Sequence, residues 1–271
     1  MKKYMNHFQY GWLLFVAVLL AACGNYQKLM KNASPEEKFS AAKNYLQEKD
    51  FMRASSLLDD VSSYFRGTAM AEDVLFFLAE SYYGQKDYYS ASEYYKAYVK
   101  NYPRGKFVKE SRYMIAVCYY SDSSDPRLDQ SFTNKAIDAF AEYIEFYPTD
   151  RRVKDAYKCI GEMQEKLAYK GYLNAKLYFD LGIYLGNNYR SAVQTAQNVL
   201  KEYPETKYRE ELSFLILNSK YKEATHSATV KRKERYSEVI DEYYNYSNEF
   251  PNGKYIGAAN RILKEAKNVL K

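Results

Sequence analysis

The chain has 271 residues, a formal net charge of +6 at pH 7, 47% hydrophobic residues and 27% charged residues. This length can bury a sizeable core, and this composition excludes a disordered chain. The positive excess is small and spread over many lysines and glutamates, so it does not indicate a nucleic-acid partner. The 32 tyrosines are unusual. Their amphipathic rings suit half-buried positions in a helical array.

Residues 1–22 have the layout of a signal peptide. Lys2 and Lys3 precede an apolar run over 12–20 that is too short to span a membrane as a mature helix. A plain signal peptide is one interpretation. The sequence Leu-Ala-Ala-Cys that ends at Cys23 instead resembles the bacterial lipobox, in which the cysteine is acylated and becomes the first residue.

We therefore expect residues 1–22 to be a lipoprotein signal peptide and Cys23 to carry a covalent lipid. Residues 23–33 would then be a lipidated tether that holds the protein at the membrane by the lipid alone. Gly24 follows the cysteine instead of aspartate, which resembles lipoproteins that are sent to the outer membrane. We expect the lipid to hold the protein on the periplasmic face of the outer membrane.

Residues 72–105 have the pattern of a tetratricopeptide repeat, a helical hairpin of about 34 residues. Ala79 and Ala91 are the small residues expected where two helices cross closely, and Pro103 ends the second helix. A single hairpin cannot bury its apolar faces alone. Closing prolines recur with spacings of 45, 56 and 47 residues, which indicates further repeats.

The predicted fold class is all-α: an α-solenoid of about five tetratricopeptide-like hairpins with a C-terminal capping helix over 254–270. The expected parts are repeats 1–3 over 34–149, then a linking helix, repeats 4–5 and the cap over 150–271. Ser34 and Pro35 mark the first helix start. Gly171 is expected to break or bend the helix that follows the third repeat.

The predicted loop over 121–130 is longer than a basic hairpin turn. Such a loop is either functional or mobile. Cys118 and Cys159 remain after Cys23, and both lie in helix-patterned apolar runs. Buried free thiols are therefore favoured over a disulfide.

The sequence gives little support for an enzyme. His226 is the one histidine after the signal peptide, and it lies in a polar run typical of a solvated surface. No metal-binding, nucleotide-binding or nucleophile motif is present. We therefore expect no catalytic residues, no metal and no cofactor other than the lipid.

The first helix of each hairpin in such an array lines a concave face. Aromatic and charged residues there suit an extended or helical peptide with apolar anchors, although the same rings could pack between repeats instead. The candidates for this peptide groove are Phe39, Lys43, Leu46, Phe76, Glu80, Tyr83, Tyr113 and Tyr120.

Together the lipobox, the five repeats and their Tyr-Pro ends resemble the BamD family, the lipoprotein component of the β-barrel assembly machine. The resemblance covers essentially the whole mature chain. It implies a non-catalytic outer-membrane assembly factor whose N-terminal repeats bind unfolded outer-membrane protein precursors. It also implies that the C-terminal repeats dock on a barrel-forming, BamA-like protein, with Lys231, Arg232 and Arg235 as candidate docking residues.

Two alternatives remain open. One is another periplasmic tetratricopeptide lipoprotein, such as the cell-division coordinator of the Tol–Pal system, although no heptad run precedes the repeats here. The other is a glycan-binding surface lipoprotein.

Overall fold

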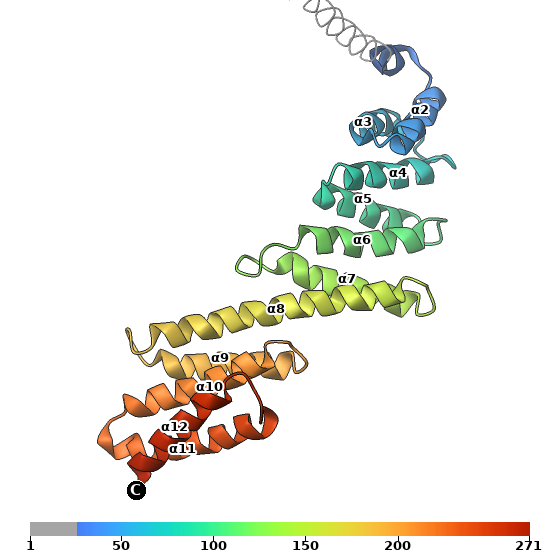
Figure 1. Ribbon diagram of the computed structural model, residues 1–271. Coiled ribbons are helices and arrows are strands. Elements are labelled where there is room, and N and C mark those ends of the chain that lie inside the picture. Colours follow the sequence, from blue (N-terminus) through green and yellow to red (C-terminus); the bar gives the residue numbers. More distant parts are fainter. Residues whose placement is uncertain (1–25) are drawn as a thin grey trace, which may run out of the picture. The chain divides into compact units, whose positions relative to one another are not determined.

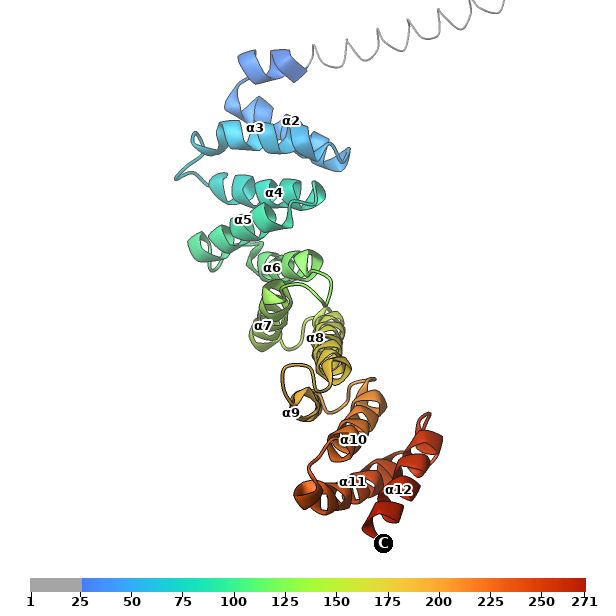
Figure 2. The same ribbon diagram turned by 90° about the vertical axis from the view of Figure 1, so that its left-hand side faces the viewer.

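The computed structural model describes residues 26–271, and these residues form helices and turns without strands (Figure 1, Figure 2). After a helical segment over 26–32, the named helices of this region are α2 (Pro35–Gln47), α3 (Phe51–Ser62), α4 (Ala71–Gly84), α5 (Tyr88–Asn101), α6 (Val108–Asp122), α7 (Ser131–Phe146), α8 (Val153–Leu181), α9 (Asn188–Glu202), α10 (Arg209–Thr225), α11 (Thr229–Glu249) and α12 (Ile256–Leu270). The all-α, tetratricopeptide-like fold class is confirmed. Cys23 lies outside the described residues.

The chain forms two compact units. The described part of the first comprises residues 26–122 with 145–147, and the second comprises residues 123–144 and 148–271. In the first unit, consecutive helices from α2 to α6 pack on each other. In the second, consecutive helices from α8 to α12 do the same.

Small residues lie where the helices of the first unit cross. Ala79 and Ala91 are fully buried, as their place in the repeat pattern predicts. Ala42 and Ala54 take the same role in the α2–α3 hairpin and are also fully buried. Around them, leucine, valine and phenylalanine side chains fill the core between α2, α3 and α4.

Local sequence fixes the helix starts of the first unit. Ser34 forms a capping box with Glu37, and Pro35 follows as the first helical residue, which confirms the predicted start of α2. Asp50 and Asp87 cap α3 and α5 with their carboxylates. The preceding residues, Lys49 and Lys86, both adopt positive φ, at 62° and 63°.

In the second unit, α8 runs unbroken for 29 residues, so the predicted break at Gly171 is wrong. A Cβ at Gly171 would lie 2.3 Å from Cγ2 of Val199 on α9. The glycine is therefore there because α9 packs closely on α8. The helix ends instead at Gly182, which has a φ of 58°.

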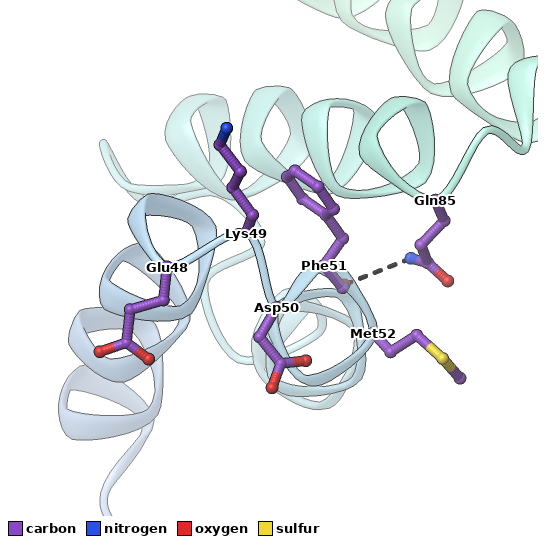
Figure 3. A pocket seen from close by; sticks show the side chains of 6 residues that line it. All are labelled: Glu48, Lys49, Asp50, Phe51, Met52 and Gln85. Atoms are coloured by element: carbon purple, nitrogen blue, oxygen red, sulfur yellow. Dashed lines mark hydrogen bonds between the residues drawn. The ribbon is translucent and has the colours of Figure 1, made fainter.

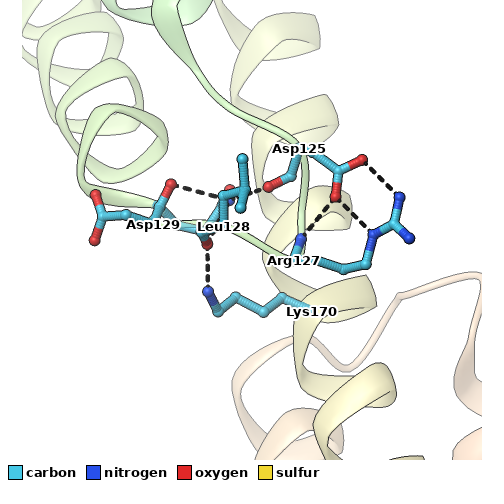
Figure 4. Close-up of polar contacts among 6 residues, drawn as sticks. Asp125, Arg127, Leu128, Asp129 and Lys170 are labelled. Carbon is cyan, nitrogen blue, oxygen red and sulfur yellow. Dashed lines mark hydrogen bonds and ion pairs between the residues drawn. The ribbon is translucent and has the colours of Figure 1, made fainter.

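The segment between α6 and α7 is held by polar contacts (Figure 4). The Gln130 amide nitrogen donates to the Asp125 carbonyl oxygen at 2.8 Å and to the Leu128 carbonyl oxygen at 3.1 Å. Lys170 of α8 also donates to the Leu128 carbonyl oxygen, and Lys166 donates to Ser123 Oγ at 2.7 Å. The predicted loop insertion is thus an ordered segment that rests on α8.

Candidate binding surfaces

The structure places two of the eight groove candidates in the core. Phe39 is 5% exposed, and its ring contacts those of Phe65 and Phe77. Phe76 is 7% exposed and stacks on Phe107, with the ring centroids 4.0 Å apart. Both rings pack within the array, as the alternative interpretation of these aromatics held.

The other candidates on α2 are accessible. Lys43 is exposed, and its Nζ lies 5.1 Å from the centroid of the Phe39 ring, within range of a cation–π contact. Leu46 is half-buried at the edge of the core that holds Phe39. These two side chains give α2 one cationic and one apolar contact point.

On α4, Glu80 and Tyr83 are half-buried. The Tyr95 hydroxyl donates a hydrogen bond to the Glu80 carboxylate. Burial raises the pKa of Glu80, the bond from Tyr95 opposes that rise, and the charge of Glu110 adds to it. The Tyr83 ring packs beside that of Tyr88, with centroids 5.6 Å apart.

On α6, Tyr113 and Tyr120 are half-buried, and each has an interaction partner within the protein. The six accessible candidates thus comprise three tyrosines, one leucine, one cation and one carboxylate. Such a set can hold apolar groups and pair with single charges.

A shallow depression of about 530 Å³ lies at the α2–α3 turn, where sequence reasoning placed no site. Its lining includes Lys49, Phe51 and Gln85 (Figure 3). The Gln85 amide nitrogen donates to the Phe51 carbonyl oxygen at 3.2 Å. The Phe51 ring lies where a side chain on Gly84 would stand, with the nearest ring atom 2.3 Å from the Cβ position. Two carboxylates, Glu48 and Asp50, complete the charged part of the lining, and that of Asp50 already caps α3.

The three docking candidates lie on the first turns of α11. Lys231 and Arg232 are exposed, and Arg232 donates to the Ser227 carbonyl oxygen at 3.3 Å. Arg235 is half-buried and pairs with Glu223 at 3.2 Å. His226 is exposed, as its polar surroundings predict, and its ring lies 5.9 Å from that of Tyr189.

Both remaining cysteines are free; Cys118 is buried and Cys159 is half-buried. Burial raises the pKa of Cys118 to about 12. Over residues 26–271, no group of histidine, cysteine and acidic residues is arranged to hold a metal ion. In the same region no helix is long and apolar enough to cross a membrane.

Comparison with known proteins identifies the family. Residues 31–236 match the family YfiO, described as outer membrane lipoprotein. The chain belongs to the YfiO family. The matched range runs from before α2 into α11, so it covers most of both compact units and leaves the rest of α11 and all of α12 outside.

Similar proteins carry BamD names. A provisionally named outer membrane protein assembly factor BamD of Aquifex aeolicus is 25% identical over 85% of this chain and 74% of its own length. The outer membrane protein assembly factor BamD of Rickettsia prowazekii is 23% identical over 82% of this chain and 83% of its own. The outer membrane protein assembly factor BamD of Neisseria meningitidis is 23% identical over 76% of this chain and 81% of its own length. The YfiO match and these relatives agree with the resemblance found in the sequence.

Proposed function

We propose that this YfiO-family protein is an outer membrane protein assembly factor that works by binding, without a covalent step. The observation that carries the proposal is the family match over residues 31–236, on an array of helix hairpins. The relatives named above are all described as BamD. No observation favours a Tol–Pal coordinator or a glycan-binding lipoprotein.

The first unit would receive unfolded barrel precursors through an extended C-terminal segment that ends in an aromatic residue. Tyr83, Tyr113 and Tyr120 supply half-buried rings for apolar anchors. Lys43 and Glu80 would pair with charges on the segment. Phe39 and Phe76 would support this surface from below, because they lie in the core.

The second unit would dock on the barrel-forming, BamA-like protein through its C-terminal repeats. Lys231 and Arg232 are exposed there and would meet acidic groups of that partner. Arg235 would act through the orientation of Glu223, with which it already pairs.

Cys23 would hold the protein on the periplasmic face of the outer membrane. The proposal rests on the lipobox and on the family description, and it needs no cofactor beyond that lipid. Replacement of the cysteine removes the acylation site, whereas replacement of Cys159, a half-buried thiol within α8, leaves it intact.

The test is depletion of the protein from its own cells, followed by quantification of β-barrel proteins in the outer membrane. We expect barrel proteins to fall and unfolded precursors to accumulate. Wild type and Cys159→Ala should restore assembly, and Cys23→Ala should restore it poorly because it stays unanchored. Normal barrel levels after complete depletion would refute the proposal.

A further inference from the structure

The turn between α8 and α9 presents apolar side chains to solvent. Ile183 is 61% exposed, Tyr184 is 66% exposed and Leu185 is 91% exposed. Isolated exposed apolar residues are common, but three in succession on one turn are not. This turn is therefore a candidate contact surface that the proposed function does not use.

Leu185 adopts a backbone conformation that leucine rarely takes. Its φ is 52°, in the left-handed region where glycine and asparagine are favoured. The turn is closed by a hydrogen bond from the Asn188 backbone nitrogen to the Gly182 carbonyl oxygen at 2.8 Å. A strained leucine on a well-formed turn points to a role for its side chain outside the fold.

The turn between α10 and α11 lies beside it, at the same end of the second unit (Figure 1). The Asn187 amide nitrogen donates to the carboxylate of Glu223, in the last helical turn of α10, at 2.8 Å, which joins the α8–α9 turn to the end of α10. Val230, in the first turn of α11, is 93% exposed. We call Ile183, Tyr184, Leu185 and Val230 the apolar tip.

Cations surround the apolar tip. Residues 222–235 carry five basic and two acidic side chains, and one of the acids, Glu223, is occupied by Arg235 and Asn187. Lys233 is exposed on α11, and Arg190 is exposed on α9. We call these last two residues the basic rim.

We propose that the apolar tip inserts into the headgroup region of an anionic phospholipid surface, with the basic rim on the lipid phosphates. Branched aliphatic side chains on a projecting turn suit the shallow apolar layer beneath the headgroups, and a tyrosine suits the boundary itself. Lysine and arginine near the surface add attraction to anionic lipid. This contact goes beyond the proposed function and would be a second membrane contact in addition to the lipid on Cys23.

The test uses the mature chain, residues 23–271 with Cys23→Ser, so that no acyl chain contributes. Its sedimentation is measured with vesicles of phosphatidylethanolamine and phosphatidylglycerol, and with vesicles of phosphatidylcholine. We expect binding to the anionic vesicles that weakens as salt rises. Changing Lys233 or Arg190 to Gln should lower the partition coefficient about fivefold each.

The double variant Leu185→Asn, Val230→Ser should lower partitioning about tenfold or more, because it removes two apolar side chains. Asparagine suits the left-handed conformation of Leu185, so the variant should fold normally. Met52→Gln is the control, because Met52 is 71% exposed and lies in the other unit. It should bind vesicles like the parent.

A tryptophan probe locates the contact. The single tryptophan, Trp12, lies in the proposed signal peptide, so residues 23–271 have none. Tyr184→Trp should shift its emission to the blue on anionic vesicles, and Tyr244→Trp should not. Absent vesicle binding at low salt, or an unshifted probe at 184, would overturn the proposal.

A separate capture assay distinguishes this inference from the proposed function. Suppose that the parent does not bind vesicles and that the double variant no longer captures a barrel-forming assembly protein in a pull-down. The apolar tip is then a protein-docking surface, and the lipid proposal is wrong. If vesicles bind but no assembly protein is ever captured, the proposed function fails and the lipid contact stands.

Discussion

The Tyr246 hydroxyl donates a hydrogen bond to the Glu210 carboxylate at 2.8 Å, across 36 positions of the chain. Glu210 lies in the first turn of α10, and Tyr246 lies near the end of α11. The turn after α11 completes the arrangement, because the Tyr255 ring stacks on Phe214 at 4.6 Å. One acid thus ties the start of a hairpin to the turn that closes it.

The first unit repeats this arrangement. The Tyr98 hydroxyl donates to Glu72, and Phe107 stacks on Phe76. Gly105 is required there, because a Cβ would lie 2.5 Å from the Tyr98 hydroxyl oxygen and 2.6 Å from the Glu72 carboxylate. The glycine of the closing sequence Tyr-Pro-Arg-Gly-Lys-Phe is therefore needed for the contact between Tyr98 and Glu72 as well as for the turn.

The α8–α9 hairpin has an acid, Glu165, at the corresponding position, but it lacks the tyrosine and the glycine of the other two hairpins. Glu165 accepts from the Lys207 backbone nitrogen at 3.2 Å, and Tyr208 stacks on Tyr169 at 4.9 Å. Val199 stands in the place of the tyrosine, so a side chain fits where the other two hairpins have glycine. Thr206 occupies that place and donates to Glu165 at 3.2 Å.

Tyr246→Phe tests this contact. The variant removes one hydroxyl and leaves the half-buried Glu210 carboxylate short of a donor, so we expect a loss of about 1–3 kcal/mol in the free energy of unfolding. Urea denaturation followed by circular dichroism measures it. Tyr244→Phe is the control, because Tyr244 is 46% exposed and should change stability little. Equal losses in the two variants would contradict the assignment.

Two glycines of α8 should respond in opposite directions to alanine. Gly161 has open space around it, so Gly161→Ala should stabilise the protein by about 0.5–1 kcal/mol through helix propensity. Gly171→Ala would drive a methyl group into Val199 and should cost about 1–3 kcal/mol. Thermal unfolding of both variants measures the contrast. A stabilising Gly171→Ala would show that α9 does not pack closely on α8.

Glu80 should make the first unit less stable as pH rises. Burial raises its pKa above the ordinary 4.5, so between these two values the folded state holds a proton that the unfolded state releases. The contribution of this residue to stability is therefore present below pH 4.5 and is lost as pH rises through the folded pKa.

Glu80→Gln should remove this dependence, because the amide oxygen still accepts from Tyr95 and carries no charge. Urea midpoints of parent and variant at pH 5 and pH 7 measure it; the variant should gain more over the parent at pH 7. A difference between the two proteins that does not vary with pH would count against the burial of Glu80.

The two thiols should differ in reactivity. Burial holds the pKa of Cys118 near 12, which keeps its thiolate scarce at pH 8, whereas Cys159 is half-buried. Iodoacetamide should therefore label Cys159 of the native protein first, and label both residues in urea. Mass spectrometry of tryptic peptides gives the ratio. Preferential labelling of Cys118 would mean that α6 opens readily.

The repeat pattern predicts the hairpins well because it records local requirements: alanine at crossings, proline after the second helix and caps at the starts. It predicts the groove less well. Phe76 has the periodicity of a groove residue, yet its partner Phe107 comes from a closing turn outside the helical pattern. Gly171 shows the same limit, because its partner Val199 belongs to the next helix. The sequence does carry one sign of these closing-turn contacts: an acid recurs four residues before an aromatic residue, at Glu72, Glu165 and Glu210.

The central claim is tested most directly by a mild-detergent pull-down of the tagged, lipidated protein from native membranes, with the captured proteins identified. We expect recovery of a large barrel protein with periplasmic repeat domains, and reduced recovery with Lys231→Glu, Arg232→Glu, while Met52→Gln captures like the parent. Recovery of peptidoglycan-linked or sugar-uptake proteins alone would contradict the assembly role and leave only the fold and the family.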